Sequence, residues 1–200
     1  MVRDSELIQD FLEGDINGFN CLARKWQVRL YSFAYRYLMD EEEAKEIVQS
    51  ALIKTYKNLR KLKNPEKFSS WIFQITVNLC KDYIKNTKNN RLTALNEEII
   101  QSESANNDHM HSMETRANPV KKLDQQNLAE IIKKTLAQLP EEQRVVIIMK
   151  EYEGFKFSEI AEFLSCPVNT VKSRMYYGLT QMQKILKKYN INGEVIFNEM

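Results

Sequence analysis

The chain has 200 residues, which is enough for one ordinary domain or two small ones. It is 43% hydrophobic and 28% charged and has only five glycines and four prolines, so its composition favours a helical globular protein over a sheet protein. The N-terminus is polar and acidic, and no apolar run approaches the length that spans a bilayer. We therefore expect neither a signal peptide nor insertion into a membrane.

The three cysteines are widely spaced, at Cys21, Cys80 and Cys166. Their spacing matches neither a zinc site nor the disulfide framework of a secreted protein. We expect buried thiols, a reducing environment and a cytoplasmic location.

The net charge of +2 is unevenly distributed. Residues 1–95 carry 16 basic and 12 acidic side chains (+4), residues 96–120 carry 1 and 5 (−4), and residues 121–200 carry 12 and 10 (+2). This pattern indicates two folded parts separated by a segment of opposite sign.

Helical periodicity dominates the first part of the chain, from Glu6 to Lys88. Asp40 precedes three glutamates, which predicts a helix N-cap followed by acids in the first turn. Residues 63–65 break the pattern, and we expect a new helix to open near Phe68.

The composition changes between about residues 88 and 119 to Asn, Ser, Glu, Asp and His, without a sustained apolar period. We expect a linker here, with one short helical turn near Leu92 to Ile100. Helical periodicity resumes at Leu123, and Pro140 is expected to open a further helix that ends near Gly154.

The predicted fold is therefore all-α, with two small helical domains and a flexible acidic linker. The domains are expected at residues 1–90 and 121–190, the linker at 91–120 and a tail at 191–200. Within the C-terminal domain, Phe157–Leu186 reads as a short helix, a tight turn and a longer helix. This helix-turn-helix is typical of proteins that place a helix in the major groove of DNA.

The longer helix of the pair is amphipathic. Its apolar side is predicted to contain Val168, Val171, Met175, Leu179, Met182 and Leu186. Its polar side is predicted to contain Thr170, Ser173, Arg174 and Tyr177, with Asn169 on the rim. Short polar groups and an arginine on an exposed face read base edges and hold phosphates, so this helix is a candidate DNA reader.

A second candidate nucleic-acid surface lies on the helix from Phe68 to about Lys88. Its apolar stripe is predicted to contain Phe68, Ile72, Ile75, Leu79 and Tyr83. Its flank is predicted to contain Gln74, Asn78, Lys81, Lys85 and Lys88, bordered by Trp71. Lysines at this spacing can follow a phosphate backbone beside an aromatic or amide that holds an unstacked base; the alternative is a solvated charged face beside a core tryptophan. The preceding loop Lys61–Lys67 is a candidate contact for a splayed strand, or simply an inter-helix loop.

The helix from Asp40 to Leu59 mixes polar residues with apolar ones on one surface. A mixed face suits a protein partner rather than DNA. An ordinary amphipathic helix is the alternative that spacing leaves open.

Three stretches, in this order, resemble the sigma-70 family of bacterial transcription initiation factors, specifically its small extracytoplasmic-function group. They are FNCLARKWQVRLYSFAYRYLMDEEEAKEIVQSALIKTYKNL, FSSWIFQITVNLCKDYIK and LAQLPEEQRVVIIMKEYEGFKFSEIAEFLSCPVNTVKSR. The similarity covers about residues 8–87 and 122–188. A lone helix-turn-helix is only moderately specific for this family, but three matching stretches in the right order and spacing are strong evidence for it.

The resemblance implies a role for each surface. The helix from Asp40 to Leu59 would dock on the clamp-helix coiled coil of the largest polymerase subunits, through Asp40, Glu46, Gln49 and Lys54. The second surface and its loop would capture a flipped base of the minus-ten element and hold its non-template strand, through Lys63, Trp71, Gln74, Asn78, Lys81 and Lys85. The helix-turn-helix would read the minus-thirty-five element through Asn169, Thr170, Lys172, Ser173, Arg174 and Tyr177.

The chain departs from the family pattern at several positions. Glu46 stands where the family usually has Asp, and Ser50 where it often has an acid, which implies a less acidic docking surface. Tyr177 stands where the family often has a basic residue, and none occurs near Leu179. This implies weaker phosphate contacts, or contacts to a base or sugar through Tyr176 and Tyr177.

The resemblance also concerns the linker and a regulator. The acidic segment would thread toward the polymerase active-site cleft and mimic nucleic acid in a basic channel, or else act as a solubilising tether. For many members the resemblance implies a membrane-anchored anti-sigma factor, and nothing in these residues establishes one here.

The sequence thus predicts a non-enzymatic specificity subunit of RNA polymerase, of the kind used in stress responses, without cofactor, metal or small-molecule substrate. It would bind core polymerase and promoter DNA and assist melting. One alternative is a stand-alone helix-turn-helix regulator, which needs a dimer interface or ligand pocket that the sequence does not suggest. The other is an enzyme or metal protein, for which Asp108, His109 and His111 are the candidate ligands. They lie in the linker without further ligands.

Overall fold

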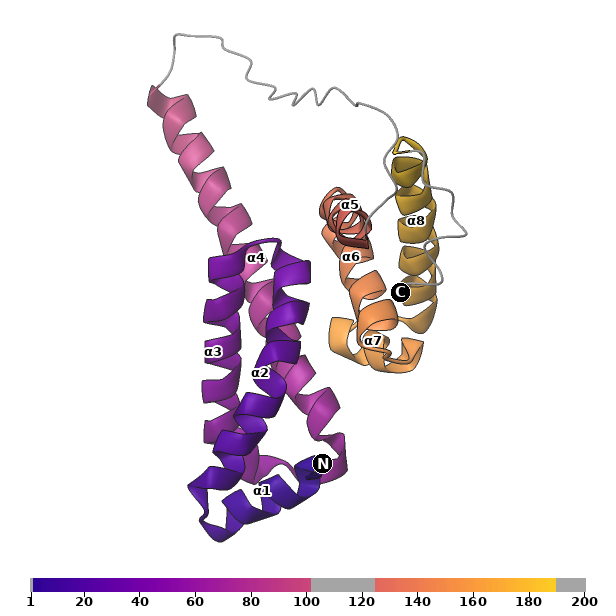
Figure 1. The fold of residues 1–200 in the computed structure, drawn as a ribbon. Helices are drawn as coiled ribbons and strands as arrows, with labels where there is room; N and C mark the ends of the chain where they lie inside the picture. The colour runs from indigo at the N-terminus through magenta and orange to yellow at the C-terminus, as the bar shows by residue number, and fades with distance from the viewer. Residues whose placement is uncertain (1, 102–124, 190–200) are drawn as a thin grey trace.

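The computed structural model describes residues 2–101 and 125–189, with side chains for residues 2–87 and 128–189. These residues form helices and turns without a strand, which confirms the all-α prediction. The helices are α1 (Asp4–Glu13), α2 (Ile16–Leu38), α3 (Glu41–Asn58), α4 (Phe68–Gln101), α5 (Gln125–Ala137), α6 (Glu141–Ile147), α7 (Phe157–Leu164) and α8 (Val168–Lys187) (Figure 1). The short turns η1 (Leu59–Lys61) and η2 (Pro65–Lys67) connect α3 to α4, and a π-helical turn, η3 (Ile148–Tyr152), extends α6. Within this described part, no helix has the length and apolar character needed to span a bilayer.

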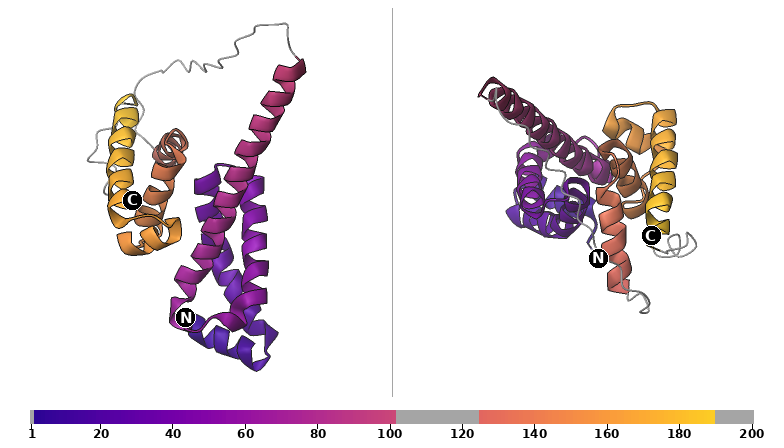
Figure 2. Two further views of the ribbon diagram at one scale, coloured as in Figure 1. Left: turned by 180° about the vertical axis from the view of Figure 1, so that it is seen from behind. Right: turned by 90° about the horizontal axis from the view of Figure 1, so that it is seen from above.

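Helices α1 to α4 form an N-terminal helical group. Helices α2 and α3 lie side by side, α4 packs on both, and α1 crosses the base of the group against α2 (Figures 1 and 2). Aromatic rings fill its centre, where Trp26 meets Phe68 and Phe73 edge-on at centroid distances of 5.6 and 6.0 Å. Phe33 meets Phe73 in the same way at 5.4 Å. Edge-to-face pairs contribute beyond the area they bury, so these rings fix how α2 lies against α4.

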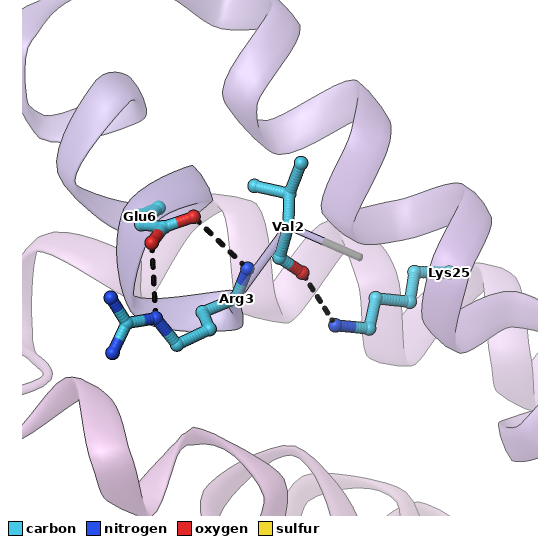
Figure 3. Close-up of polar contacts among 4 residues, drawn as sticks. All are labelled: Val2, Arg3, Glu6 and Lys25. Carbon is cyan, nitrogen blue, oxygen red and sulfur yellow. Dashed lines mark hydrogen bonds and ion pairs between the residues drawn. The ribbon is translucent and has the colours of Figure 1, made fainter.

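The residues just before α1 hold its first turn in place (Figure 3). The Arg3 backbone N–H donates to the Glu6 carboxylate at 3.2 Å, and the Arg3 guanidinium donates to the same group at 3.0 Å. These bonds, that from the backbone first, lower the pKa of Glu6. Lys25 of α2 donates to the Val2 carbonyl at 3.2 Å. The start of the chain is thereby tied to α2.

Several helix boundaries lie where the sequence predicts them. The Asp40 carboxylate accepts a hydrogen bond from the Glu43 N–H at 3.1 Å, so Asp40 is the N-cap of α3. The break falls at η2, which Pro65 begins, and α4 opens at Phe68. Helix α6 starts directly after Pro140.

Helix α4 is longer than predicted. The sequence places its end near Lys88 and only a short turn near Leu92 to Ile100, whereas the helix is continuous to Gln101. Residues 68–101 contain neither Pro nor Gly, so nothing in the backbone chemistry stops the helix.

The buried face of α4 also differs from the predicted stripe. Its fully buried residues are Phe68, Ile72, Phe73, Thr76, Val77 and Cys80. Ile75, Leu79 and Tyr83 of the predicted stripe are only partly buried. The reason is that α4 packs against α7 as well as against α2 and α3, so two sides of the helix are covered.

Helices α5 to α8 form a C-terminal helical group. Helices α5, α6 and α7 all pack against α8. The approach of α6 is close, because a Cβ at Gly178 would lie 2.7 Å from Ile147 Cδ1 and 3.2 Å from Gln143 Cβ. Helix α7 ends at Ser165 in the left-handed conformation (φ 52°), and α8 begins three residues later, which confirms the predicted helix-turn-helix.

The cysteines are not all buried. Cys80 is buried and Cys166 partly buried, but Cys21 is exposed. The prediction of buried thiols is therefore wrong for Cys21, because α2 turns the neighbouring Leu22 and Trp26 inward instead.

Gly18 lies where α1 and α2 come closest. An added Cβ would lie 2.5 Å from the Leu7 carbonyl oxygen and 2.9 Å from the Phe11 nitrogen. Both are backbone atoms, so we predict that Gly18→Ala lowers the free energy of unfolding by about 1–3 kcal/mol in urea denaturation. Asn20→Ala, at an exposed position of the same helix, is the control and should change it by less than about 0.5 kcal/mol. Equal stability of the two variants would contradict the close approach.

Candidate nucleic-acid and polymerase interfaces

Helix α8 exposes a polar face, but the residues on it are not all the predicted ones. Its exposed residues are Val168, Asn169, Lys172, Ser173, Tyr176, Tyr177, Gln183, Lys184 and Lys187. Thr170 is only partly exposed, and the predicted core residue Val168 is 37% exposed because it begins the helix beside the turn. Instead, Gly178 and Ile185 join the buried side.

Arg174 lies at the edge of this face and points back toward the protein. Its Nη2 donates to Glu142 Oε2 of α6 at 2.6 Å, and its Nη1 lies 3.7 Å from the Cys166 sulfur. Only 24% of its side chain is exposed. The predicted outward orientation of Arg174 is therefore wrong. Its guanidinium links α8 to α6 and to the turn, through a partner 32 residues away that helical periodicity does not reveal.

Two tyrosines provide the largest exposed surface of α8. Tyr176 and Tyr177 are 69% and 61% exposed, and their rings meet edge-on with centroids 5.7 Å apart. Helical periodicity alone did not place Tyr176 on the polar face. Gly178 is the residue that could have revealed its exposure: a glycine lets α6 approach closely, so it marks the buried side of α8, and Tyr176 lies away from that side.

The α4 surface, consisting of Trp71, Gln74, Asn78, Lys81 and Lys85, follows one flank of the helix as predicted. Asn78 and Lys85 are exposed, while Trp71, Gln74 and Lys81 are partly covered. Gln74 Nε2 donates to Asn78 Oδ1 at 3.1 Å and to the Phe163 carbonyl of α7 at 3.3 Å. The amide expected to meet a base is thus already hydrogen-bonded within the protein.

The loop before α4 keeps its lysines in solvent. Lys61, Lys63 and Lys67 are all exposed. Asn64 Oδ1 accepts from the Glu66 N–H at 3.0 Å and shapes the turn between them. The Lys61 ammonium donates to Asn58 Oδ1 at 2.9 Å, and all three ammonium groups are accessible to phosphates.

The α3 residues expected to bind polymerase are all on the surface. Asp40, Glu46, Gln49 and Lys54 are exposed. Beside them the structure shows a groove of about 550 Å³ between α2 and α3. Its lining residues are Gln27, Val28, Tyr31, Lys45, Val48, Gln49 and Leu52.

The contribution of α2 to this groove was missed from the sequence. Val28 is 71% exposed and lies on the groove wall. An apolar residue that falls outside the buried stripe of its helix is the signal that could have found it. The groove, defined by these α2 and α3 residues, is named here the docking groove.

Within the described residues, no group of three or more His, Cys, Asp or Glu side chains could hold a metal ion. Asp108, His109 and His111 lie outside the described residues. Burial raises the pKa of the Cys80 thiol and of the Tyr37 hydroxyl, so both groups stay protonated at neutral pH.

Two family models match the chain, sigma-70 region 2 over residues 22–90 and sigma-70 region 4 over residues 129–182. The chain is also 30% identical over 178 residues to the ECF RNA polymerase sigma-E factor of Haemophilus influenzae, with 88% of this chain and 90% of that protein covered. The chain belongs to the sigma-70 family. It is a member of the extracytoplasmic-function (ECF) group, since the sigma-E factor of Escherichia coli K12 matches equally, at 30% identity over 175 residues and with 88% and 90% coverage. It is 25% identical over 189 residues to the RNA polymerase sigma-H factor of Pseudomonas aeruginosa, with 92% and 94% coverage.

Solved structures share the fold of this sigma factor. CnrH, solved with the cytosolic domain of CnrY, superimposes with a TM-score of 0.62 at 19% identity and covers 92% of this chain and 97% of CnrH. The sigma factor RpoE of Bartonella quintana, solved with the anti-sigma factor NepR, gives 0.57 at 22% identity and 86% and 98% coverage.

This ECF sigma factor therefore binds core RNA polymerase and directs promoter-specific transcription initiation through the minus-ten and minus-thirty-five elements. The family consists of transcription initiation factors rather than enzymes, and membership of it replaces the alternative of a stand-alone helix-turn-helix regulator. Region 2 includes α3 and the whole α4 surface, and region 4 includes α7 and most of α8.

Proposed function

We propose that this sigma factor divides its work among three separate surfaces. The docking groove and the α3 residues bind core polymerase, the α4 surface with Lys63 captures unpaired minus-ten bases, and the exposed face of α8 reads the minus-thirty-five duplex. The observation that carries this proposal is that three different helices expose three chemically distinct faces: apolar with acids, amide with lysines, and tyrosine with short polar groups. The two readers belong to an N-terminal domain (residues 1–90) and a C-terminal domain (121–190) acting on DNA in the cytoplasm.

Base capture by the α4 surface would stabilise melted DNA. Unstacking costs a few kcal/mol per base step, and stacking on a protein aromatic returns about 1–3 kcal/mol per base. Trp71 is partly exposed and offers such a ring, while Lys81 and Lys85 follow it at helical spacing for the phosphates. Since the two terms are of similar size, capture shifts melting only when polymerase holds the rest of the promoter.

On α8, aromatic contact would replace charge. Lys172 is exposed beside Tyr176, and Arg174 is engaged with Glu142. Tyrosine offers a ring for sugar or thymine methyl groups and a hydroxyl for base edges or phosphates. We therefore assign upstream reading to Asn169, Lys172, Ser173, Tyr176 and Tyr177, and a positioning role to Arg174.

The docking groove yields a direct test. We predict that Val28→Asp lowers the affinity for core polymerase tenfold or more, because it places a charge in an apolar contact. Gln49→Ala should weaken binding less. The measurement is fluorescence anisotropy of labelled protein titrated with core polymerase.

Ile16→Asp is the matched control. Ile16 is 54% exposed at the start of α2, outside the groove and away from the α3 residues, so the affinity of this variant should stay within about twofold of that of the unchanged protein. A loss as large as that of Val28→Asp would place the docking surface elsewhere.

Substitutions in the two proposed DNA-reading surfaces should impair different steps of initiation. We predict that Asn78→Ala and Lys81→Ala slow promoter melting, followed by permanganate reactivity, while core affinity is unchanged. Lys172→Ala and Tyr176→Ala should instead reduce the advantage of templates with an intact minus-thirty-five element. We expect each aromatic substitution to reduce the affected step about tenfold. We expect each lysine substitution to make DNA affinity depend less steeply on salt concentration.

Two further variants serve as references for this test. Lys134→Ala removes a charge that is exposed on α5, outside the three surfaces, and should change neither step. Arg174→Ala should lower the thermal stability of the C-terminal group and affect the upstream element only through that loss. If all variants reduced melting and upstream dependence together, the division of work would be wrong.

We also propose an anti-sigma partner, supported by the sigma factor RpoE of the same fold, which was solved with the anti-sigma factor NepR. A small membrane protein encoded beside this chain would be the candidate. Adding its purified cytosolic segment to holoenzyme assembly should suppress promoter-specific transcripts in proportion to its concentration. Undiminished transcription at a tenfold excess would exclude that candidate.

A further inference from the structure

A cavity of about 320 Å³ lies between α2, α5 and η3. Small-molecule pockets in proteins begin at about 300 Å³ and are lined mainly by apolar and aromatic side chains with a few polar groups. The walls of this cavity have that character, because they include Tyr31, Tyr35 and Met39 of α2, Ile132 and Leu136 of α5 and Tyr152 of η3. Apart from Tyr31, which also lines the docking groove, none of these residues belongs to the three surfaces of the proposed function.

The cavity offers flat aromatic surface to a ligand. The Tyr31 and Tyr35 rings are parallel, with an interplanar angle of 2° and centroids 6.0 Å apart, and both side chains are half-buried. Tyr152 contributes a third ring from η3. Burial raises the pKa of Tyr152, so its hydroxyl stays protonated at neutral pH and can donate a hydrogen bond. These walls suit an apolar body that carries a hydrogen-bond acceptor.

Two cations also line the cavity. Arg36 and Lys133 are half-buried, and each lies over a ring of the cavity wall. The Arg36 guanidinium is 4.3 Å from the centre of the Tyr152 ring, and the Lys133 ammonium is 4.7 Å from that of Tyr35. Such cation–π contacts are favourable but leave the positive charge in place. Among the described residues no carboxylate forms an ion pair with either cation, and none lines the cavity.

The acids that act on Lys133 are paired with other lysines. Glu41 and Glu130 attract Lys133, but Glu41 pairs with Lys45 at 3.0 Å and Glu130 pairs with Lys134 at 3.8 Å. A half-buried cation has lost part of its hydration, so an anion that takes the place of the lost water is favourable. The electrostatics of the cavity therefore favour a negatively charged ligand.

The volume limits the size of that ligand. At the packing density of protein interiors, about 0.74, the cavity holds a ligand of about 240 Å³. This is enough for a two-ring aromatic acid or a medium-chain fatty acid. An inorganic anion such as phosphate would meet the cations but leave the apolar walls uncovered, so it fits less well.

We propose that this cavity binds a small amphipathic carboxylate. The acidic group meets Arg36 and Lys133, and the aromatic or aliphatic body lies against the tyrosine rings and the apolar side chains of α5. A guanidinium matches a carboxylate in shape as well as charge, because it can donate to both oxygens. The site goes beyond the polymerase and promoter surfaces and does not depend on their assignment. A ligand that touches three elements binds the folded protein and not the unfolded chain, so it raises the melting temperature.

Titration calorimetry of the full chain tests the site with defined probes. 2-Naphthoate and decanoate distinguish an aromatic from an aliphatic body, and their neutral amides, 2-naphthamide and decanamide, are the matched controls. At least one acid should bind saturably below about 1 mM and raise the melting temperature with its concentration. Its amide should bind at least about tenfold more weakly, because the charge-assisted contact is lost. No saturable binding of either acid, or equal binding of acid and amide, would overturn the proposal.

Two variants test where the acid binds. Lys133→Met keeps the apolar stem of the side chain and should weaken binding about tenfold. Ala129 lines the cavity and is exposed, so Ala129→Phe can place a ring in the cavity without disturbing the core and should abolish binding. Lys134→Met removes the neighbouring charge outside the cavity and should leave the affinity within about twofold. Equal effects of Lys133→Met and Lys134→Met, or unchanged binding by Ala129→Phe, would contradict the proposed site.

Photolabelling locates the ligand without any substitution. The probe is 4-benzoylbenzoate, a carboxylate whose ketone joins to a neighbouring C–H bond under near-ultraviolet light. Peptide mass spectrometry should find the label on Met39 or on residues 129–136 of α5, and an excess of the tighter calorimetric probe should prevent it. Label confined to other peptides would overturn the proposal. Since neither polymerase nor DNA is present, these outcomes do not depend on whether the proposed function holds.

Discussion

Phe73 is the residue on which the arrangement of this protein depends. Its ring contacts Trp26 and Phe33 within the N-terminal group and Phe155 of the C-terminal group, and the Arg29 guanidinium lies 5.1 Å from its centre. One side chain therefore belongs to a domain core and to a contact between domains. Because protein interiors are close-packed, a shift of α7 is felt at the centre of the N-terminal group and the reverse. This sharing explains why α4, which carries Phe73, is covered on two sides and why the surface proposed to bind DNA is partly covered.

The sequence was sufficient for features that depend on neighbours in the chain. The Asp40 cap and the break at Pro65 follow from local chemistry and lie where predicted, and the predicted turn between two helices within Phe157–Leu186 is present. The failures have a common physical cause, which is contact between distant segments. The buried stripe of α4 was predicted as if one side were covered, and Arg174 was predicted to point outward because Glu142 lies on another helix. Periodicity reports that a face is buried but not what covers it.

The chemistry of α8 fits a reader that works within a larger complex. Two exposed tyrosines and one adjacent lysine give contact area and hydrogen bonds but little net charge. A protein that binds DNA alone needs several phosphate contacts, since these supply most non-specific affinity. A polymerase subunit has that affinity from its partner, so its own helix can be devoted to positions on the bases. The engagement of Arg174 with Glu142 fits the same account, because it fixes the angle of α8 rather than adding charge to its face.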